Sequence, residues 1–254
     1  MRGFKEGRCR RTMNYYVDIH ANLLPGLAGL GGGALTESEA DARISVFKES
    51  NVKLAVAAPY YDPAAYLPED FLAQRDEKIA ALAQTAAPMR IVGGAVLPYQ
   101  FCMEQPRLLR QLAIGASGYF LVDLPHEPVS AELCEQLSRL KIVSGMCPIA
   151  ADADRLFDIW SPEDWIAVRQ AGILLQISVN GLLRPENRKL TLYLLANQYA
   201  HLIATGSRDI AEPLGFAETM RIVQRSLPAQ YYRRVKNNAG MVLSDAEPSA
   251  FLQA

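Results

Sequence analysis

Short apolar runs rich in Val, Ile and Leu alternate along the chain with longer amphipathic stretches. This order is typical of repeated strand and helix units, in which the buried strands have nearly continuous apolar sequences. We predict seven short strands, at residues 16–20, 53–57, 91–97, 119–124, 141–145, 173–178 and 201–205. The pattern therefore indicates an α/β protein with parallel strands.

The stretches between these runs carry helix signals. Thr36-Glu37-Ser38-Glu39 has the spacing of a capping box, and Ala40, Ile44 and Phe47 follow it on one helical face. Pro162 and Pro185 suit the first turn of a helix. Besides the helix after Thr36, we predict helices at 69–86, 104–113, 130–140, 162–171, 185–200, 214–226 and 229–239.

No linker, charge run or shift in composition divides the chain, so we expect one domain over residues 13–245 and a tail at 246–254. Its fold is expected to be a distorted seven-stranded (β/α) barrel, similar to a TIM barrel, with an open doubly wound sheet as the alternative. The active face of a barrel lies where its strands end. Here those ends are residues 20–22, 59–61, 96–98, 123–126, 146–148 and 206–208.

Composition and charge exclude several partners. The chain is 50% hydrophobic with a net charge of -1, which gives no overall basic field for nucleic acid or an anionic membrane. No segment reaches about 18 apolar residues, so we expect no membrane insertion. Residues 1–12 are basic and are interpreted as a disordered arm or as an over-extended start before Met13. Four scattered cysteines suit the reducing cytoplasm.

The three histidines differ in their positions along the predicted strands. His20 ends the first strand, with Asp18 two residues earlier on the same side, so it is a candidate metal ligand or general base. It could equally be a hydrogen-bonded residue at a loop entrance. His126 lies in a Pro-rich loop and His201 begins the last strand, so both are expected to be structural or incidental.

Cysteine chemistry is not favoured. A thiol phosphatase needs an Arg six residues after its thiolate. Cys147 is followed at that distance by Ala153, and Cys134 by Leu140. We therefore expect Cys147 to be a small residue of the core or of a ligand pocket.

Residues 18–26, Asp-Ile-His-Ala-Asn-Leu-Leu-Pro-Gly, resemble the Asp-Ile-His-x-His-x-Leu-Pro-Gly opening of a known family. This family is the manganese-dependent tyrosine phosphatases of capsule and exopolysaccharide regulation, within the polymerase and histidinol phosphatase (PHP) superfamily. The likeness extends over about residues 13–245. It continues at 58–61 (Thr-Pro-His-His in the family), 121–125 (Leu-Ile-Glu-Phe-Pro), 176–178 and 201–209 (His-Phe-Ile-Ala-Ser-Asp-Ala-His-Asn).

The resemblance implies a PHP-type barrel whose strand ends hold Mn²⁺ or another divalent metal through His and carboxylate ligands. It also implies a bacterial tyrosine kinase, or its phosphorylated tail, as partner. The chain departs from the family at most ligand positions. They are occupied here by Asn22, Tyr60, Gly94-Ala95-Val96, Cys147 (for the His of Ala-His-Pro-Glu-Arg), Gly206 and Arg208, while His20 and Asp123 remain as metal-ligand candidates.

We therefore expect a pseudophosphatase that holds no metal and acts by binding in capsular polysaccharide synthesis. Arg208 would repel a divalent cation and could pair with Asp123 or Asp18, either to hold a phosphate or carboxylate or only as an internal salt bridge. The catalytic candidates are His20, Asp123 and Arg208, and the expected ligand pocket comprises Asp18, Asn22, Tyr60, His126, Cys147 and Arg208.

Two alternatives stay open at this point. One is an active phosphotyrosine phosphatase or phosphoesterase with a reduced metal centre built from His20, Asp123 and Cys147. The other is an unrelated reaction on the same scaffold, because a fold does not fix a function. The sequence leaves the oligomeric state open.

Overall fold

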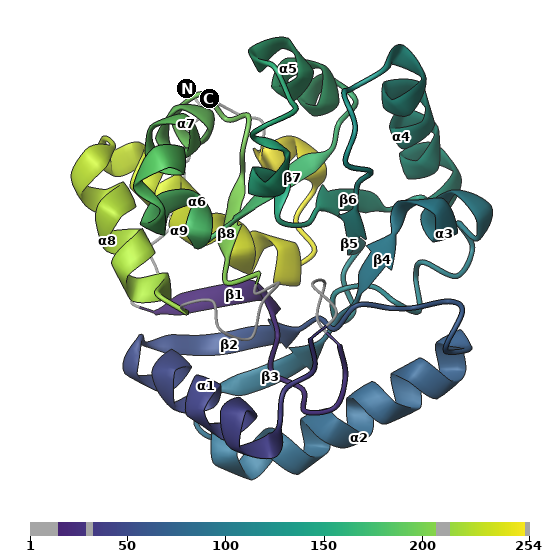
Figure 1. Cartoon of the computed structure of the whole chain (residues 1–254), viewed down its shortest axis with the longest axis vertical. Coiled ribbons are helices and arrows are strands. Elements are labelled where there is room, and N and C mark those ends of the chain that lie inside the picture. Colours follow the sequence, from purple (N-terminus) through teal and green to yellow (C-terminus); the bar gives the residue numbers. More distant parts are fainter. Residues whose placement is uncertain (1–14, 29–32, 207–213, 252–254) are drawn as a thin grey trace, which may run out of the picture.

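The computed structural model describes residues 15–28, 33–206 and 214–251. Parallel strands alternate with helices along this part of the chain (Figure 1). The first sheet has the order β1-β2-β3 and the second the order β4-β5-β6-β7-β8. The strands are β1 (Tyr16–Ala21), β2 (Val52–Ala57), β3 (Arg90–Gly93), β4 (Val96–Pro98), β5 (Tyr119–Asp123), β6 (Cys147–Ala150), β7 (Leu174–Ser178) and β8 (Leu202–Ala204).

The helices lie around the outside of the two sheets (Figure 1). They are α1 (Glu37–Glu49), α2 (Pro68–Ala86), α3 (Tyr99–Glu104), α4 (Ala131–Ser144), α5 (Pro162–Gln170), α6 (Asn180–Leu183), α7 (Pro185–Ala196), α8 (Phe216–Ser226) and α9 (Ala229–Leu243), with 3₁₀ turns at Ala153–Leu156 and Pro248–Phe251. None of the helices in the described ranges is long and apolar enough to cross a bilayer.

The two sheets adjoin at both sides. The Gly206 N–H, just after β8, donates to the carbonyl of His20 on β1 over 2.9 Å. On the other side, Tyr60 forms an isolated parallel bridge with Val96 of β4. The expected α/β class with parallel strands is thus confirmed. The described residues contain eight strands in two sheets, so the closed seven-stranded barrel is not confirmed.

The extra strand arises because the predicted strand at 91–97 is broken in two. Gly94 and Ala95 separate β3 from β4, and the Gly94 N–H donates to the carbonyl of Ala57 over 2.9 Å. A Cβ atom on Gly94 would lie 2.7 Å from Val56 Cγ1. The backbones approach so closely here that only glycine fits, and the chain changes sheets at this point.

Two predicted elements are wrong. Residues 141–145 are not a strand, because the helix capped by Ser130 continues to Ser144 and ends at Gly145 in the left-handed conformation, with φ of 63°. The strand follows at Cys147–Ala150. The helix predicted at 104–113 is also wrong, since α3 ends at Glu104 and turns follow it.

The predicted helix starts after Thr36, at Pro162 and at Pro185 are confirmed. Thr36 and Glu39 form a complete capping box at α1, and Ser161 and Asp164 form another at α5. A proline occupies the first turn of α5 and of α7. These caps satisfy backbone N–H groups that have no partner inside their own helix.

The core has two parts. A large cluster joins the helices to the outer faces of the sheets, with Trp165, Phe47 and Phe71 among its fully buried side chains. A smaller cluster fills the space between the strands themselves, and includes Ile19, Val56, Leu121, Ile149 and Leu202. The strands are therefore apolar on both faces, as their sequences predict.

Candidate functional site at the strand ends

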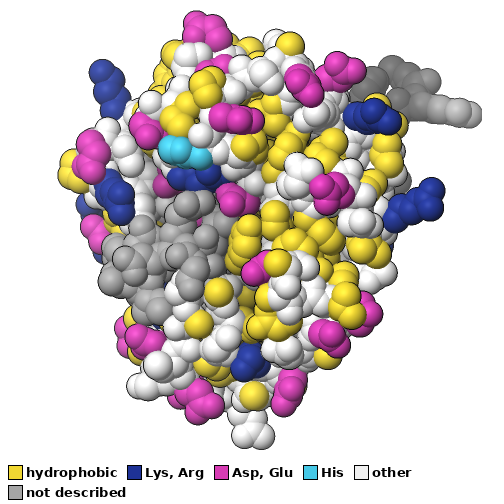
Figure 2. Space-filling view, turned by 45° about the vertical axis from the view of Figure 1, so that its right-hand side comes forward, with side chains coloured by type: hydrophobic (Ala, Val, Ile, Leu, Met, Phe, Trp, Pro, Cys, Tyr) yellow, Lys and Arg dark blue, Asp and Glu magenta, His cyan; other side chains and the backbone are white. Residues whose placement is uncertain are grey.

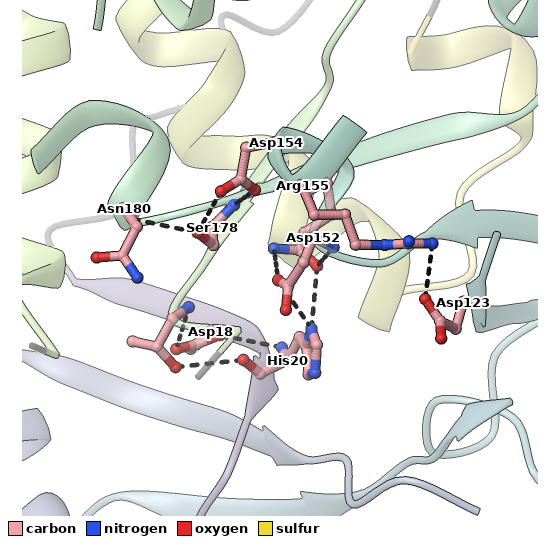
Figure 3. A network of polar contacts seen from close by, with 10 residues as sticks. Asp18, His20, Asp123, Asp152, Asp154, Arg155, Ser178 and Asn180 are labelled. Atoms are coloured by element: carbon pink, nitrogen blue, oxygen red, sulfur yellow. Dashed lines mark hydrogen bonds and ion pairs between the residues drawn. The ribbon is translucent and has the colours of Figure 1, made fainter. Parts of the chain in front are cut away.

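Buried polar side chains gather where β1, β5, β6, β7 and β8 end (Figure 3). We call this group the strand-end cluster. Its members are Asp18, His20, Asp123, Asp152, Asp154, Arg155, Gln176, Ser178 and Thr205.

Asp18 and His20 are two residues apart on β1, so both side chains project to the same side. They are 0% and 2% exposed. One carboxylate oxygen of Asp18 accepts from the His20 N–H over 3.0 Å and the other accepts from the Thr205 N–H over 3.1 Å. The Thr205 hydroxyl donates to the His20 carbonyl over 3.2 Å. Asp18 thus joins β1 to the end of β8.

The Nδ1 edge of the His20 imidazole faces both Asp152 (Figure 3) and Gln176. His20 Nδ1 is 3.0 Å from Gln176 Oε1 and 3.5 Å from Asp152 Oδ1. Gln176 Oε1 also accepts from the Asp152 N–H, and Gln176 Nε2 donates to Asp152 Oδ1, each over 3.0 Å. Both neighbours offer Nδ1 acceptor oxygens, so Nδ1 carries the proton.

These contacts shift the pKa of His20. Burial disfavours the imidazolium, but the negative charge and hydrogen bonding of Asp152, with the hydrogen bond to Gln176, raise the pKa of His20 above its ordinary value. His20 Nε2 has no hydrogen-bond partner in the described part of the chain. Within the described residues, Nε2 of His20 therefore remains available for a ligand.

Asp152 sits in an uncommon backbone conformation, with φ of 44°, immediately after β6. Its carboxylate packs against Gly206, which also has positive φ, at 47°. A Cβ atom on Gly206 would lie 1.8 Å from Asp152 Oδ1. Asp152 therefore occupies the space that any side chain at position 206 would need.

Asp154 caps the end of β7. Its two carboxylate oxygens accept from the N–H and the hydroxyl of Ser178, each over 2.7 Å, and the Ser178 hydroxyl accepts from the Asn180 N–H over 3.2 Å. Burial, together with the nearby charge of Asp152, raises the pKa of Asp154 to about 6. Burial likewise raises the pKa of Asp18 to about 6. Both carboxyl groups have structural hydrogen bonds that occupy their oxygens.

Asp123, at the end of β5, pairs with a cation. Arg155 Nη2 lies 2.7 Å from Asp123 Oδ1 and also donates to the Leu124 carbonyl. Tyr60 lies close by, and its pKa is raised first by burial and then by the negative charge of Asp123. Asp123 thus forms an ion pair with Arg155, which the sequence did not suggest, and the expected pairing of Arg208 with Asp123 or Asp18 stays a prediction. Arg208 lies outside the described residues.

Asn22 follows β1 and is 4% exposed. Its carbonyl accepts from Arg43 Nη1 over 3.3 Å, whereas its side-chain Nδ2 is buried without a hydrogen-bond partner. A buried amide donor without a partner costs stability unless a ligand or water satisfies it. Within the described residues, the amide donor of Asn22 is therefore left for a ligand or a water molecule.

His126 lies at the rim. Its side chain is 53% exposed, with Nε2 3.6 Å from Asp158 Oδ1 and 3.1 Å from the Arg155 carbonyl. Figure 2 shows a histidine side chain at the surface among charged neighbours. His126 thus reaches the cluster only through the backbone of Arg155.

Cys147 does not lie at the strand ends. It starts β6, at the opposite end of the strand from Asp152, and is 2% exposed. Burial raises the pKa of its thiol to about 12. The sequence interpretation that put Cys147 in the ligand pocket, or in a reduced metal centre with His20 and Asp123, is therefore corrected.

A thiol-labelling experiment checks this placement. We expect Cys147 to resist an aromatic disulfide reagent in the folded protein and to react once the chain is unfolded in urea, because its thiol is buried and protonated. Cys134, which is only half-buried, supplies the comparison. Labelling of Cys147 at the rate of Cys134 in the native state would contradict a buried position.

His201 precedes β8, at the end of the strands opposite to the cluster. Its Nδ1 accepts from the Leu175 N–H over 3.2 Å. Burial, with the positive charges of Arg169 and Arg234, lowers its pKa to about 3. His201 is a neutral core histidine, as its place in the sequence suggests.

This lowered pKa predicts that the free energy of unfolding falls as the solution becomes more acidic. The unfolded chain binds a proton at His201 near pH 6.5 and the folded chain does not until about pH 3, so folding weakens as pH falls through that window. Replacing His201 with Asn keeps an acceptor for Leu175. Between pH 6.5 and pH 5 the wild type should lose about 2 kcal/mol more than His201→Asn in urea unfolding. Equal losses of unfolding free energy in the two proteins would show that the folded chain does not hold His201 in its neutral form.

Sequence reasoning missed Asp152, Asp154 and Arg155. Residues 151–155, Ala-Asp-Ala-Asp-Arg, follow the family pattern Ala-His-Pro-Glu-Arg when aligned without a gap. The false strand at 141–145 shifted the alignment and placed Cys147 at the His position. Asp152 follows the observed strand β6 and lies beside His20, so the ungapped pattern pairs an acidic residue with the family's histidine.

Parallel strands flanked by helices, with a polar cluster at their ends, define an α/β protein of the fold seen in metal-dependent tyrosine phosphatases. One chain from the crystal structures of YwqE from Bacillus subtilis and CpsB from Streptococcus pneumoniae, described as unique metal-dependent tyrosine phosphatases, matches with a TM-score of 0.78 and 17% identity, over 91% of this chain and 95% of that chain. Residues 16–244 match the family described as capsular polysaccharide synthesis, CpsB/CapC. The chain belongs to this CpsB/CapC family.

More distant structures also align. An inactive dihydroorotase-like domain of a CAD-like multifunctional protein from Chaetomium thermophilum gives a TM-score of 0.48 at 11% identity, over 91% of this chain and 80% of that chain. A D-hydantoinase gives 0.47 at 11% identity, over 87% of this chain and 68% of that chain. A search of curated protein sequences finds no match.

The donor atoms of the cluster do not fit a centre of two or three metal ions. The carboxylate oxygens of Asp18 and Asp154 already accept hydrogen bonds from backbone N–H or hydroxyl groups. Asp123 is paired with Arg155. The described residues contain no group of three or more His, Cys, Asp and Glu side chains placed to hold a metal ion. A metal centre needs about three protein ligands besides water, and within the described ranges His20 is not part of such a group.

Proposed function

We propose that the chain is a pseudophosphatase of capsular polysaccharide synthesis, a member of the CpsB/CapC family that binds and does not hydrolyse. One observation carries this proposal. Two carboxylates of the strand-end cluster are occupied by groups of the chain itself, because Arg155 pairs with Asp123 and the imidazole of His20 lies 3.5 Å from Asp152. Without a metal centre there is no metal-bound hydroxide to attack a phosphate ester.

The ligand we propose is a phosphotyrosine side chain on a partner polypeptide in the cytoplasm, such as a bacterial tyrosine kinase or its phosphorylated tail. The donors left at the strand ends suit an anion. Asn22 Nδ2 is a buried amide donor without a partner among the described residues, and His20 would supply a further N–H at Nε2 in its protonated form. Arg208, which follows β8 in the sequence, would add a permanent positive charge.

Two assays on the full chain test the proposal. We expect no turnover of an aryl phosphate above the buffer rate, with or without added Mn²⁺. We also expect a phosphotyrosine peptide to bind more tightly than its unphosphorylated form. Arg208→Ala and Asn22→Ala should each reduce this difference. If both variants bind the phosphopeptide as well as the parent, the proposed ligand site is wrong.

The alternative is a working phosphatase with a reduced metal centre. The arrangement of His20 favours it, because metal-ligating histidines usually donate one ring N–H to a carboxylate or carbonyl and ligate through the other nitrogen. Mn²⁺-dependent turnover that disappears in His20→Ala would establish this alternative and end the pseudophosphatase proposal.

A further inference from the structure

The near-zero net charge of the chain hides a strong separation of charge. Residues 13–172 carry 20 acidic and 12 basic side chains, whereas residues 173–244 carry four acidic and nine basic ones. The helix α9 contains Arg233, Arg234 and Lys236 and no acidic residue. In Figure 1, α7, α8 and α9 lie together on one side of the molecule, away from α1 and α2. One side of the molecule therefore has a local positive field.

Tyrosines are concentrated at the same side. Six of the 11 tyrosines lie at the starts of β1 and α9, at the end of α7 or before β8, which is the opposite end of the strands from His20 and Asp152. We call this region the tyrosine–arginine surface. Its residues are Tyr15, Tyr16, Tyr193, Tyr199, Tyr231 and Tyr232 with Arg169, Arg233, Arg234 and Lys236.

Contacts join these side chains into one surface. All four cation–π contacts of the described residues lie here, with Lys236 Nζ 4.7 Å from the ring centre of Tyr16 and Arg234 4.9 Å from that of Tyr231. Arg234 Nη2 also donates to the Leu195 carbonyl over 3.4 Å, which holds α9 against α7. Tyr193, on α7, and Tyr15 remain 49% and 37% exposed.

Arg233 is the most available cation of this surface. It is exposed, and within the described ranges it makes no hydrogen bond or ion pair. Lys236 lies three positions further on the same helix, so the two cations are neighbours on one face. A charge presented to solvent, as that of Arg233 is, serves long-range attraction to an anionic partner more than it serves folding.

We propose that the tyrosine–arginine surface docks the chain on an anionic lipid bilayer. Tyrosine is enriched at membrane interfaces because its ring is apolar and its hydroxyl is polar, and basic residues are attracted to anionic headgroups. The surface has both kinds of side chain and needs no pocket for a flat partner. Docking by this end leaves the strand-end cluster facing away from the bilayer.

Co-sedimentation of the full chain with vesicles tests the proposal. We expect binding to vesicles of phosphatidylcholine with phosphatidylglycerol, and no binding to phosphatidylcholine alone. Arg233→Glu should lower the partition coefficient by at least about tenfold, and Tyr193→Ser should lower it further in the same background. Raising the salt concentration should weaken binding, because the attraction is screened.

The matched control is Arg139→Glu, which makes the same charge change on the exposed face of α4. It should leave the partition coefficient unchanged. Equal loss in both variants would show that only net charge matters and would overturn the docking surface. Binding to a soluble polyanion such as heparin without binding to anionic vesicles would also overturn it, in favour of an acidic polymer. Aryl phosphate turnover does not enter this test, so it fails or succeeds separately from the proposed function.

Discussion

Gly206→Ala is expected to destabilise the protein by about 3 kcal/mol or more. The new Cβ would lie 1.8 Å from Asp152 Oδ1, and Asp152 is 1% exposed, with its carboxylate held by Gln176 and His20. The carboxylate would have to leave both partners inside the core. Positive φ at position 206 adds a further cost for any residue with a Cβ. Urea unfolding at neutral pH measures the loss.

A double-mutant cycle separates the two causes. In the Asp152→Ala background the steric conflict is gone, and Gly206→Ala should then cost only about 1 kcal/mol for its backbone conformation. A cost that is the same in both backgrounds would show that Asp152 does not occupy this space. The cycle thus tests whether Asp152 is the residue that prevents a side chain at position 206.

Arg155→Met is the second large effect, with an expected loss of about 3 kcal/mol. Asp123 and Arg155 are only 24% and 11% exposed, and removing one partner of a buried ion pair leaves the other charge poorly compensated. The double variant Arg155→Met/Asp123→Leu should recover most of the loss, because replacing both charges with apolar groups is close to neutral. Urea unfolding again provides the measurement.

Arg139→Met serves as the control for this pair. Arg139 is exposed on α4, and its replacement should change stability by less than about 0.5 kcal/mol. If Arg155→Met lowers the free energy of unfolding no more than Arg139→Met does, then the Asp123–Arg155 pair does not contribute to stability. The contact between His20 and Asp152 would then be the remaining evidence that the cluster is occupied by the chain's own groups.

Much of the fold could be predicted from the sequence because its signals are local. The capping box at Thr36, the proline of α5 and the apolar runs of β1, β5 and β7 each depend on a few adjacent residues. The end of α4 could not be predicted in this way. Its last turn, Lys141-Ile142-Val143-Ser144, has β-branched apolar residues typical of a strand, yet Ile142 and Val143 are exposed on the helix, which continues until Gly145 ends it in the left-handed conformation.

Prediction of the site depended on where the strand after α4 was placed. His20 and Asp18 could be identified because they end a strand whose limits were right. Asp152 and Arg155 were missed because the false strand moved the expected strand end to residues 146–148. The hydrogen bonds from Gln176 to His20 and Asp152 join residues more than 20 positions apart, and no local pattern indicates them.

Metal content tests the central claim most directly. The protein would be purified without chelator, dialysed against Mn²⁺ and then against buffer, and analysed for bound metal by elemental analysis, with His20→Ala treated in parallel. We predict substoichiometric metal in both proteins, because Arg155 already pairs with Asp123 and the imidazole of His20 already contacts Asp152. Stoichiometric metal in the wild type that is lost in His20→Ala would contradict it and make the strand-end cluster a metal centre.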